Sequence, residues 1–140
     1  MDEPEIRRLE ALGLRQKAER HLDQARTVLP QAAYELALVG AYTAAELIVR
    51  ALLLLKPNVT MPHTHGGTTQ MFGREYIKTG VAPREWGRLL DEKLQLRSGA
   101  LYDVDTIISR EEAESVIGLA QDMLDFLDHQ LEETAHGDSN

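Results

Sequence analysis

Apolar residues recur every three or four positions over the first part of the chain, the spacing of one face of an α-helix. The recurring positions are Leu14, Ala18, Leu22, Ala25 and Leu29. Pro30 ends this pattern, because proline breaks a helix interior but fits the first turn of the next helix. Residues 32–56 are then apolar on nearly all sides, apart from Glu35, Glu46 and Arg50, and they predict a helix buried at the centre of the protein.

Two more helices are predicted in the middle of the chain. A short one is expected over residues 69–78, between a loop rich in proline and glycine and Gly80. Pro83 then opens a fourth helix. Its apolar stripe consists of Trp86, Leu90, Leu94 and Leu101.

A capping box marks the start of a last helix, in which Ser109 accepts from the first turn and Glu112 reaches back to the cap. The apolar stripe behind it consists of Ala113, Val116, Ile117, Ala120, Leu124, Leu127 and Leu131. Residues 134–140 are polar and are expected to fray. Long amphipathic helices with short connections pack as an up-and-down bundle. We therefore expect an all-α fold of four to five helices in a single domain over residues 1–140, with its core at about residues 14–133.

The composition agrees with a small helical protein, since 21 of the 140 residues are Leu and 15 are Ala. The chain has no cysteine, which excludes disulfides, thiol catalysis and cysteine-ligated metals. The apolar run over residues 47–55 is broken by Arg50 and is far shorter than the roughly 20 residues that span a bilayer. The acidic residues 1–6 are unlike a secretory signal. We expect a cytoplasmic protein without membrane association.

Charge is distributed unevenly along the chain, whose net charge is −8. Residues 1–73 sum to zero, residues 74–102 to +2 and residues 103–140 to −10. Blocks of one sign usually form a solvated face. The alternative is a local basic site on an acidic molecule, where a phosphate group binds without nonspecific adhesion to nucleic acid.

Arg97 lies on the apolar stripe of the fourth helix, three residues after Leu94 and four before Leu101. A guanidinium in that position needs an anion or a protein interface, because an unpaired buried charge is costly. Glu46 poses the same problem midway along the most apolar helix, four residues before Arg50. Glu46 is either a structural partner of Arg50 or Arg97 on the inward side of its helix, or part of a polar patch with Arg97 and Tyr42.

Gly99 interrupts the fourth helix near Arg97 at a cost of roughly 1 kcal/mol relative to alanine. Tyr102 follows Arg97 by five residues, which places the two about 140° apart on a straight helix. They face one site within a chain only if the helix bends or ends near Gly99. We interpret residues 97–103 as a helix terminus that presents side chains. Metal-ligand and phosphate-loop motifs are missing from the sequence, so we expect no cofactor and no metal.

Three stretches of the chain resemble the HEPN superfamily, small all-α domains of prokaryotes that are often encoded beside a minimal nucleotidyltransferase. The stretch that resembles the long second helix contains Tyr34-Glu35-Leu36-Ala37, Ala44-Ala45-Glu46 and Arg50-Ala51-Leu52-Leu53. The third-helix segment contains His65-Gly66-Gly67 and Phe72-Gly73-Arg74-Glu75-Tyr76-Ile77-Lys78-Thr79-Gly80. The junction before the last helix contains Leu96-Arg97-Ser98-Gly99-Ala100-Leu101-Tyr102-Asp103 and Ser109-Arg110-Glu111-Glu112-Ala113-Glu114.

The resemblance implies a homodimer in which two Arg-x(4–6)-His motifs line one cleft that cleaves RNA without a metal. Arg97 corresponds to the arginine that holds the scissile phosphate, and Glu46 to the polar residue that positions it. Tyr102 stands where the motif has its histidine, and a phenol with a pKa near 10 is a poor proton shuttle at neutral pH.

The sequence therefore leaves two interpretations open. The first is the HEPN component of a toxin–antitoxin-like pair that acts at an RNA or nucleotide phosphate, with or without endoribonuclease activity. Its candidate catalytic residues are Arg97, Tyr102 and Glu46, and its candidate RNA- or nucleotide-binding residues are Arg97, Ser98, Tyr42, Arg50 and Asp103. The second is a non-catalytic homodimeric module that partners a nucleotidyltransferase, in which Arg97 and Glu46 are structural and Tyr102 is a packing residue.

Overall fold

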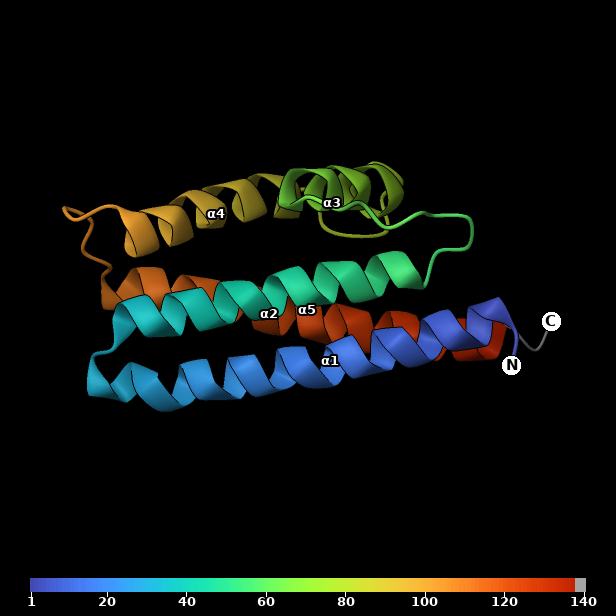
Figure 1. Ribbon diagram of the computed structural model, residues 1–140, viewed down its shortest axis with the longest axis horizontal. Coiled ribbons are helices and arrows are strands. Elements are labelled where there is room, and N and C mark those ends of the chain that lie inside the picture. Colours follow the sequence, from blue (N-terminus) through green and yellow to red (C-terminus); the bar gives the residue numbers. More distant parts are fainter. Residues whose placement is uncertain (138–140) are drawn as a thin grey trace.

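The computed structural model describes residues 1–137 of the chain. These residues form helices joined by connections, and they contain no strand. The elements are α1 (Glu3–Val28), the 3-10 turn η1 (Leu29–Gln31), α2 (Tyr34–Leu54), α3 (His65–Phe72), the π-helical turn η2 (Gly73–Ile77), α4 (Trp86–Tyr102) and α5 (Arg110–Gly137). The four long helices lie along the molecule and successive ones run in opposite directions, while α3 sits beside the start of α4 (Figure 1). The predicted all-α, up-and-down bundle is confirmed.

Two helix starts differ from the apolar pattern, because capping groups rather than apolar residues determine them. α1 begins at Glu3, where the Asp2 carboxylate accepts from the Glu5 amide. α3 begins at His65, because the Thr64 hydroxyl accepts from the Gly67 amide. The short helix predicted over residues 69–78 therefore begins earlier, at His65. Its second half, Gly73–Ile77, is a π-helical turn.

Two boundaries in the second half of the chain also differ from the prediction. Pro83 does not open the fourth helix but lies in the turn before it, where its carbonyl accepts from the Trp86 amide at 3.2 Å. At the other end, α5 continues through Gly137, so residues 134–137 belong to the last helix, and their fraying stays a prediction. The remainder of the predicted tail, residues 138–140, lies outside the described residues.

The central helix is α2, which packs against α1, α5, α4 and α3. Thirteen of its 21 residues are buried, as expected for a helix that is apolar on all sides. Among the described residues, α2 is also the one helix long and apolar enough to cross a membrane. Its apolar surface is covered by the other helices of the bundle, which agrees with a core helix.

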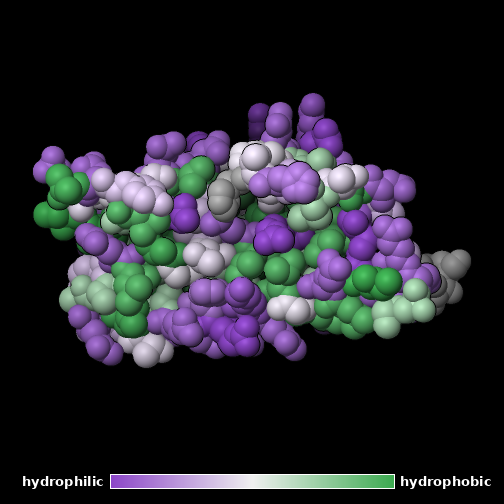
Figure 2. All heavy atoms as spheres, in the orientation of Figure 1, coloured by the Kyte–Doolittle hydropathy of each residue, from purple (hydrophilic) through white to green (hydrophobic). Residues whose placement is uncertain are grey.

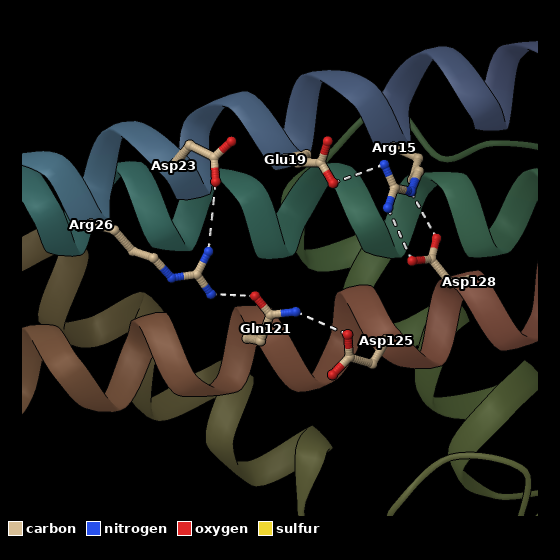
Figure 3. Close-up of polar contacts among 7 residues, drawn as sticks. All are labelled: Arg15, Glu19, Asp23, Arg26, Gln121, Asp125 and Asp128. Atoms are coloured by element: carbon tan, nitrogen blue, oxygen red, sulfur yellow. Dashed lines mark hydrogen bonds and ion pairs between the residues drawn. The ribbon is translucent and has the colours of Figure 1, made fainter.

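Polar contacts join α1 to α5 along one side of the bundle (Figure 3). Arg15 donates to both carboxylate oxygens of Asp128, at 2.7 and 3.0 Å, and also contacts Glu19 at 3.0 Å. Further along, Arg26 donates to Gln121, whose amide donates to an Asp125 carboxylate oxygen. A bidentate pair fixes orientation as well as distance, so these contacts set how α1 lies along α5.

Aromatic residues hold η2 and α4 against the core. The buried Tyr76 of η2 donates its hydroxyl hydrogen to the Leu52 carbonyl near the end of α2. Phe126 of α5 packs edge-on against both Tyr76 and Trp86, at ring-centroid distances of 6.0 and 5.3 Å. Trp86 is the first residue of α4, so this aromatic group determines where α4 starts to run across α2.

Arg7 of α1 caps the end of α2. Its guanidinium donates to four carbonyl oxygens, those of Leu53, Leu54, Lys56 and Val59, at 3.0–3.2 Å. The last carbonyls of a helix have no partner within the helix, and a positive charge there also suits the helix dipole. Arg7 therefore fixes the chain as it leaves α2 toward α3.

We predict that Arg7→Met lowers the free energy of unfolding by about 1–3 kcal/mol, because half-buried carbonyls lose a charged donor. The methionine keeps most of the aliphatic stem of the arginine. Thermal unfolding followed by circular dichroism measures the effect, with Arg20→Met at an exposed position of α1 as the matched control. Equal melting temperatures for the two variants would contradict this role of Arg7.

Candidate functional site

Arg97 of α4 faces Tyr42 of α2, and its guanidinium carbon lies 5.8 Å from the centre of the tyrosine ring. The Nε atom of Arg97 is buried, and it has no hydrogen-bond partner among the described residues. The rest of the side chain is half-buried. Placement on the apolar stripe thus brings the guanidinium into the seam between α2 and α4, where the cation–π contact with Tyr42 offsets part of its desolvation.

The Tyr42 hydroxyl remains protonated at physiological pH. Burial of the ring, together with the negative charges of Glu46 and Asp91, raises the pKa of Tyr42 to about 12, and the positive charge of Arg97 opposes this rise. Glu46, Asp91 and Arg97 are therefore close enough to Tyr42 to act on its ionisation. A neutral phenol carries no negative charge, so Tyr42 does not offset the positive charge of Arg97.

Three of the predicted residues, Tyr42, Glu46 and Arg50, line one cavity of about 190 Å³ between α2, α3 and α4. The other lining residues are Thr43, Leu47, Val49, Thr68, Thr69 and Leu90. Glu46 is half-buried, whereas Arg50 is exposed. Arg97 does not line this cavity and is linked to it through its contact with Tyr42. The polar patch of Tyr42, Glu46 and Arg97, and an ion pair of Glu46 with Arg97 or Arg50, stay predictions.

The other predicted residues lie elsewhere on α4. Ser98, Tyr102 and Asp103 line an open groove of about 960 Å³ that Arg97 does not line. Tyr102 is 81% exposed, so the interpretation of Tyr102 as a packing residue is wrong for the single chain. Because α4 continues without a break through Gly99 to Tyr102, the condition for Arg97 and Tyr102 to face one site within a chain is not met.

Gly99 allows the connection between α4 and α5 to lie close against α4, and the helix continues past it to Tyr102. A Cβ atom on Gly99 would lie 3.0 Å from the Thr106 hydroxyl oxygen and 3.2 Å from its methyl carbon. Asp103 organises the same connection, since its carboxylate accepts from the Asp105 amide at 3.0 Å. This bond and one from the Thr106 hydroxyl lower the pKa of Asp103. Asp103 therefore has local partners within its own turn.

Sequence reasoning missed the exposed apolar side chains around this connection, Leu36, Leu101, Val104 and Ile107, which we call the apolar patch. Leu36, Leu101 and Ile107 line one shallow pocket, and Val104 lines the open groove together with Tyr102. Val104 and Ile107 are 96% and 86% exposed. Figure 2 shows hydrophobic side chains gathered at the end of the molecule where α2 begins and α4 ends. The sequence could have indicated this patch, because it places apolar residues in a short connection between two helices, where side chains are usually exposed. A contiguous exposed apolar patch marks an interaction surface.

Comparisons with known proteins agree with this architecture. The sequence profile of the HEPN domain family matches residues 11–130, which include α2, α4 and the seam between them. Two proteins of Methanocaldococcus jannaschii are each 33% identical to this chain. "Putative toxin MJ0142" aligns over 102 residues, 73% of this chain and 68% of the relative, and "Putative toxin MJ0605" over 126 residues, 90% of this chain and 92% of the relative. The chain belongs to the HEPN domain family.

The contact at Gly99 predicts an unusual response to a helix-favouring substitution. Gly99→Ala should fail to stabilise the protein, because Thr106 must move, although alanine is favoured over glycine in a helix by about 1 kcal/mol. In a Thr106→Ala background the crowding is reduced, and the same change should raise the free energy of unfolding. Urea unfolding of the four chains gives this double-mutant cycle. Stabilisation by Gly99→Ala alone, equal to that in the Thr106→Ala background, would contradict the assigned contact.

Proposed function

We propose that this HEPN-family protein is the toxin-like component of a toxin–antitoxin-like pair and acts at a phosphate of RNA or of a nucleotide through Arg97. The single observation that carries the proposal is the half-buried Arg97, whose guanidinium lies against a neutral aromatic ring and whose buried Nε has no hydrogen-bond partner among the described residues. An arginine needs no histidine to bind phosphate, because its planar fork forms charge-assisted hydrogen bonds. The names of the two archaeal relatives support the toxin-like assignment.

Proton transfer is the step of RNA cleavage for which this site has the least suitable side chain. The group at the histidine position of the motif is the exposed phenol of Tyr102, and a phenol is a poorer proton shuttle than the imidazole that it replaces. Tyr102 also lines a groove without Arg97. We therefore propose that cleavage is absent or much slower than in relatives that carry histidine, and that Tyr102 acts as a hydrogen-bond donor.

A second candidate function is a non-catalytic module that binds a minimal nucleotidyltransferase. The observation that favours it is the apolar patch of Leu36, Leu101, Val104 and Ile107, of which Val104 lines the same groove as the exposed Tyr102. A tyrosine on such a patch is accessible to a docked protein, and its hydroxyl is an acceptor of the type that a nucleotidyltransferase modifies. In this interpretation Arg97 stabilises the seam of α2 and α4.

A homodimer would bring Arg97 of one copy and Tyr102 of the other to the same cleft. Arg97 lies toward α2, whereas Ser98, Tyr102 and Asp103 line the open groove, so a shared cleft requires Tyr102 from a second copy. We propose that the apolar patch takes part in this association, because its burial removes large exposed side chains from water.

The phosphate proposal predicts weak, salt-sensitive RNA binding. Arg97→Ala should abolish binding of a short single-stranded RNA, measured by fluorescence anisotropy, whereas Tyr102→Phe should retain most of it, because the phenol is not essential for holding phosphate. Gel analysis of the same RNA should show cleavage absent or slow. Binding or efficient cleavage that persists in Arg97→Ala would refute the assignment of the site.

The dimer proposal predicts about twice the monomer mass of 15.7 kDa in multi-angle light scattering at micromolar concentration. Replacing Val104 and Ile107 by serine should shift the population to monomer, because the patch loses apolar area. Serine at Leu9, an exposed apolar position of α1, is the control and should leave the mass unchanged. A monomer at all concentrations for the unmodified chain would remove the shared-cleft interpretation.

A further inference from the structure

We propose that residues 60–71 form a lid, which opens by local unfolding and gives access to the cavity between α2, α3 and α4. The lid consists of most of α3 and the connection before it, which loops out from the end of α2 (Figure 1). Among the lid residues whose side chains are described, none is buried. A segment with few buried contacts opens at a lower free-energy cost than the core does.

Both ends of the lid are anchored to the bundle. Before it, Val59 is 8% exposed, and its carbonyl accepts from the Arg7 guanidinium at 3.0 Å. After it, Phe72 is completely buried, and its ring centroid lies 5.6 Å from that of Tyr76. The lid therefore moves between two fixed points, and it opens without the detachment of either anchor.

The helical part of the lid is intrinsically weak. Gly66 and Gly67 both lie in the first turn of α3, and glycine is the least favoured residue in a helix apart from proline. A helix of eight residues is also too short to be stable in water without tertiary packing. Its cap is local, because the Thr64 hydroxyl that accepts from the Gly67 amide belongs to the lid itself. The first turn and its cap are therefore lost together when the lid opens.

The lid supplies one wall of the cavity, through Thr68 and Thr69, and all other lining residues belong to α2 and α4. On these two helices, Val49 and Leu90 line the cavity and are each 3% exposed. Because α2 and α4 pack on each other and on the rest of the bundle, they stay in place when the lid opens. Opening therefore joins the cavity of about 190 Å³ to solvent and exposes side chains that are otherwise buried.

This inference goes beyond the proposed function and does not depend on it. Arg97 does not line the cavity, but Tyr42 lines it and has its ring 5.8 Å from the guanidinium carbon of Arg97. An open lid therefore lets a molecule from solution reach Tyr42 from the side of the cavity. The lid thus regulates access to one side of the seam between α2 and α4.

Because the chain has no cysteine, one introduced thiol measures the opening directly. Val49→Cys places the thiol in the cavity wall, and Val116→Cys, at a completely buried position of α5, is the matched control. An excess of a thiol-reactive disulfide should label Val49→Cys about tenfold faster than Val116→Cys, or faster still. Low urea concentrations should accelerate the labelling of Val116→Cys alone, because local opening exposes little surface. Equal rates with an equal response to urea would overturn the lid.

Two alanine variants identify the element that opens. Gly66→Ala adds a methyl group that meets nothing within 4 Å and favours the helix, so it should slow the labelling of Val49→Cys about two- to fivefold. Gly118→Ala in α5, where the added group also meets nothing within 4 Å, stabilises the whole protein instead and should leave this rate unchanged. Equal slowing by both variants, or no slowing by Gly66→Ala, would overturn the lid.

Hydrogen exchange of the unmodified chain gives a second measurement, which does not depend on a variant that folds. The backbone amides of residues 69–71 should exchange much faster than those at the centre of α2, and low urea concentrations should not accelerate them. The same protection and the same response to urea in both segments would overturn the lid.

Discussion

The seam between α2 and α4 is organised by one constraint, a guanidinium on an otherwise apolar helix stripe. Arg97 retains a charge in a partly dry environment, and the aromatic face of Tyr42 is its observed partner. Because burial and nearby carboxylates keep Tyr42 neutral, this partner attracts the cation without neutralising it. We propose that a cation held in this way binds an external phosphate.

The rest of the bundle keeps this seam in place. Arg7 fixes the end of α2, Tyr76 ties η2 to the same end, and Trp86 with Phe126 anchors the start of α4. At the opposite end, Gly99 allows the connection between α4 and α5 to lie close against the helix. The consequence is that α4 is straight through the motif, which directs Arg97 inward and leaves Tyr102 in solvent.

Periodicity predicted the helices and the unusual position of Arg97, because both depend on which positions of a helix face the core. It did not predict where α1 and α3 begin, since Asp2 and Thr64 act there as caps, nor the π-helical turn, which has no apolar signature. Residues 97–103 do contain the end of α4, at Tyr102, but the reason for glycine at position 99 was missed because its tertiary neighbour, Thr106, is not visible in a local pattern. Thr68 and Thr69 were missed for the same reason, since an ordinary threonine becomes a lining residue only when α3 is placed beside α2 and α4.

We propose that Arg97 neutralises a phosphate of a bound nucleic acid strand. The most direct measurement is the dependence of the RNA association constant on salt concentration, for the unmodified protein, Arg97→Gln and the surface control Arg20→Gln. One lost phosphate contact should reduce the slope of log K against log salt by about 0.7 for a single strand, in Arg97→Gln and not in the control. An identical slope for all three proteins would contradict the claim.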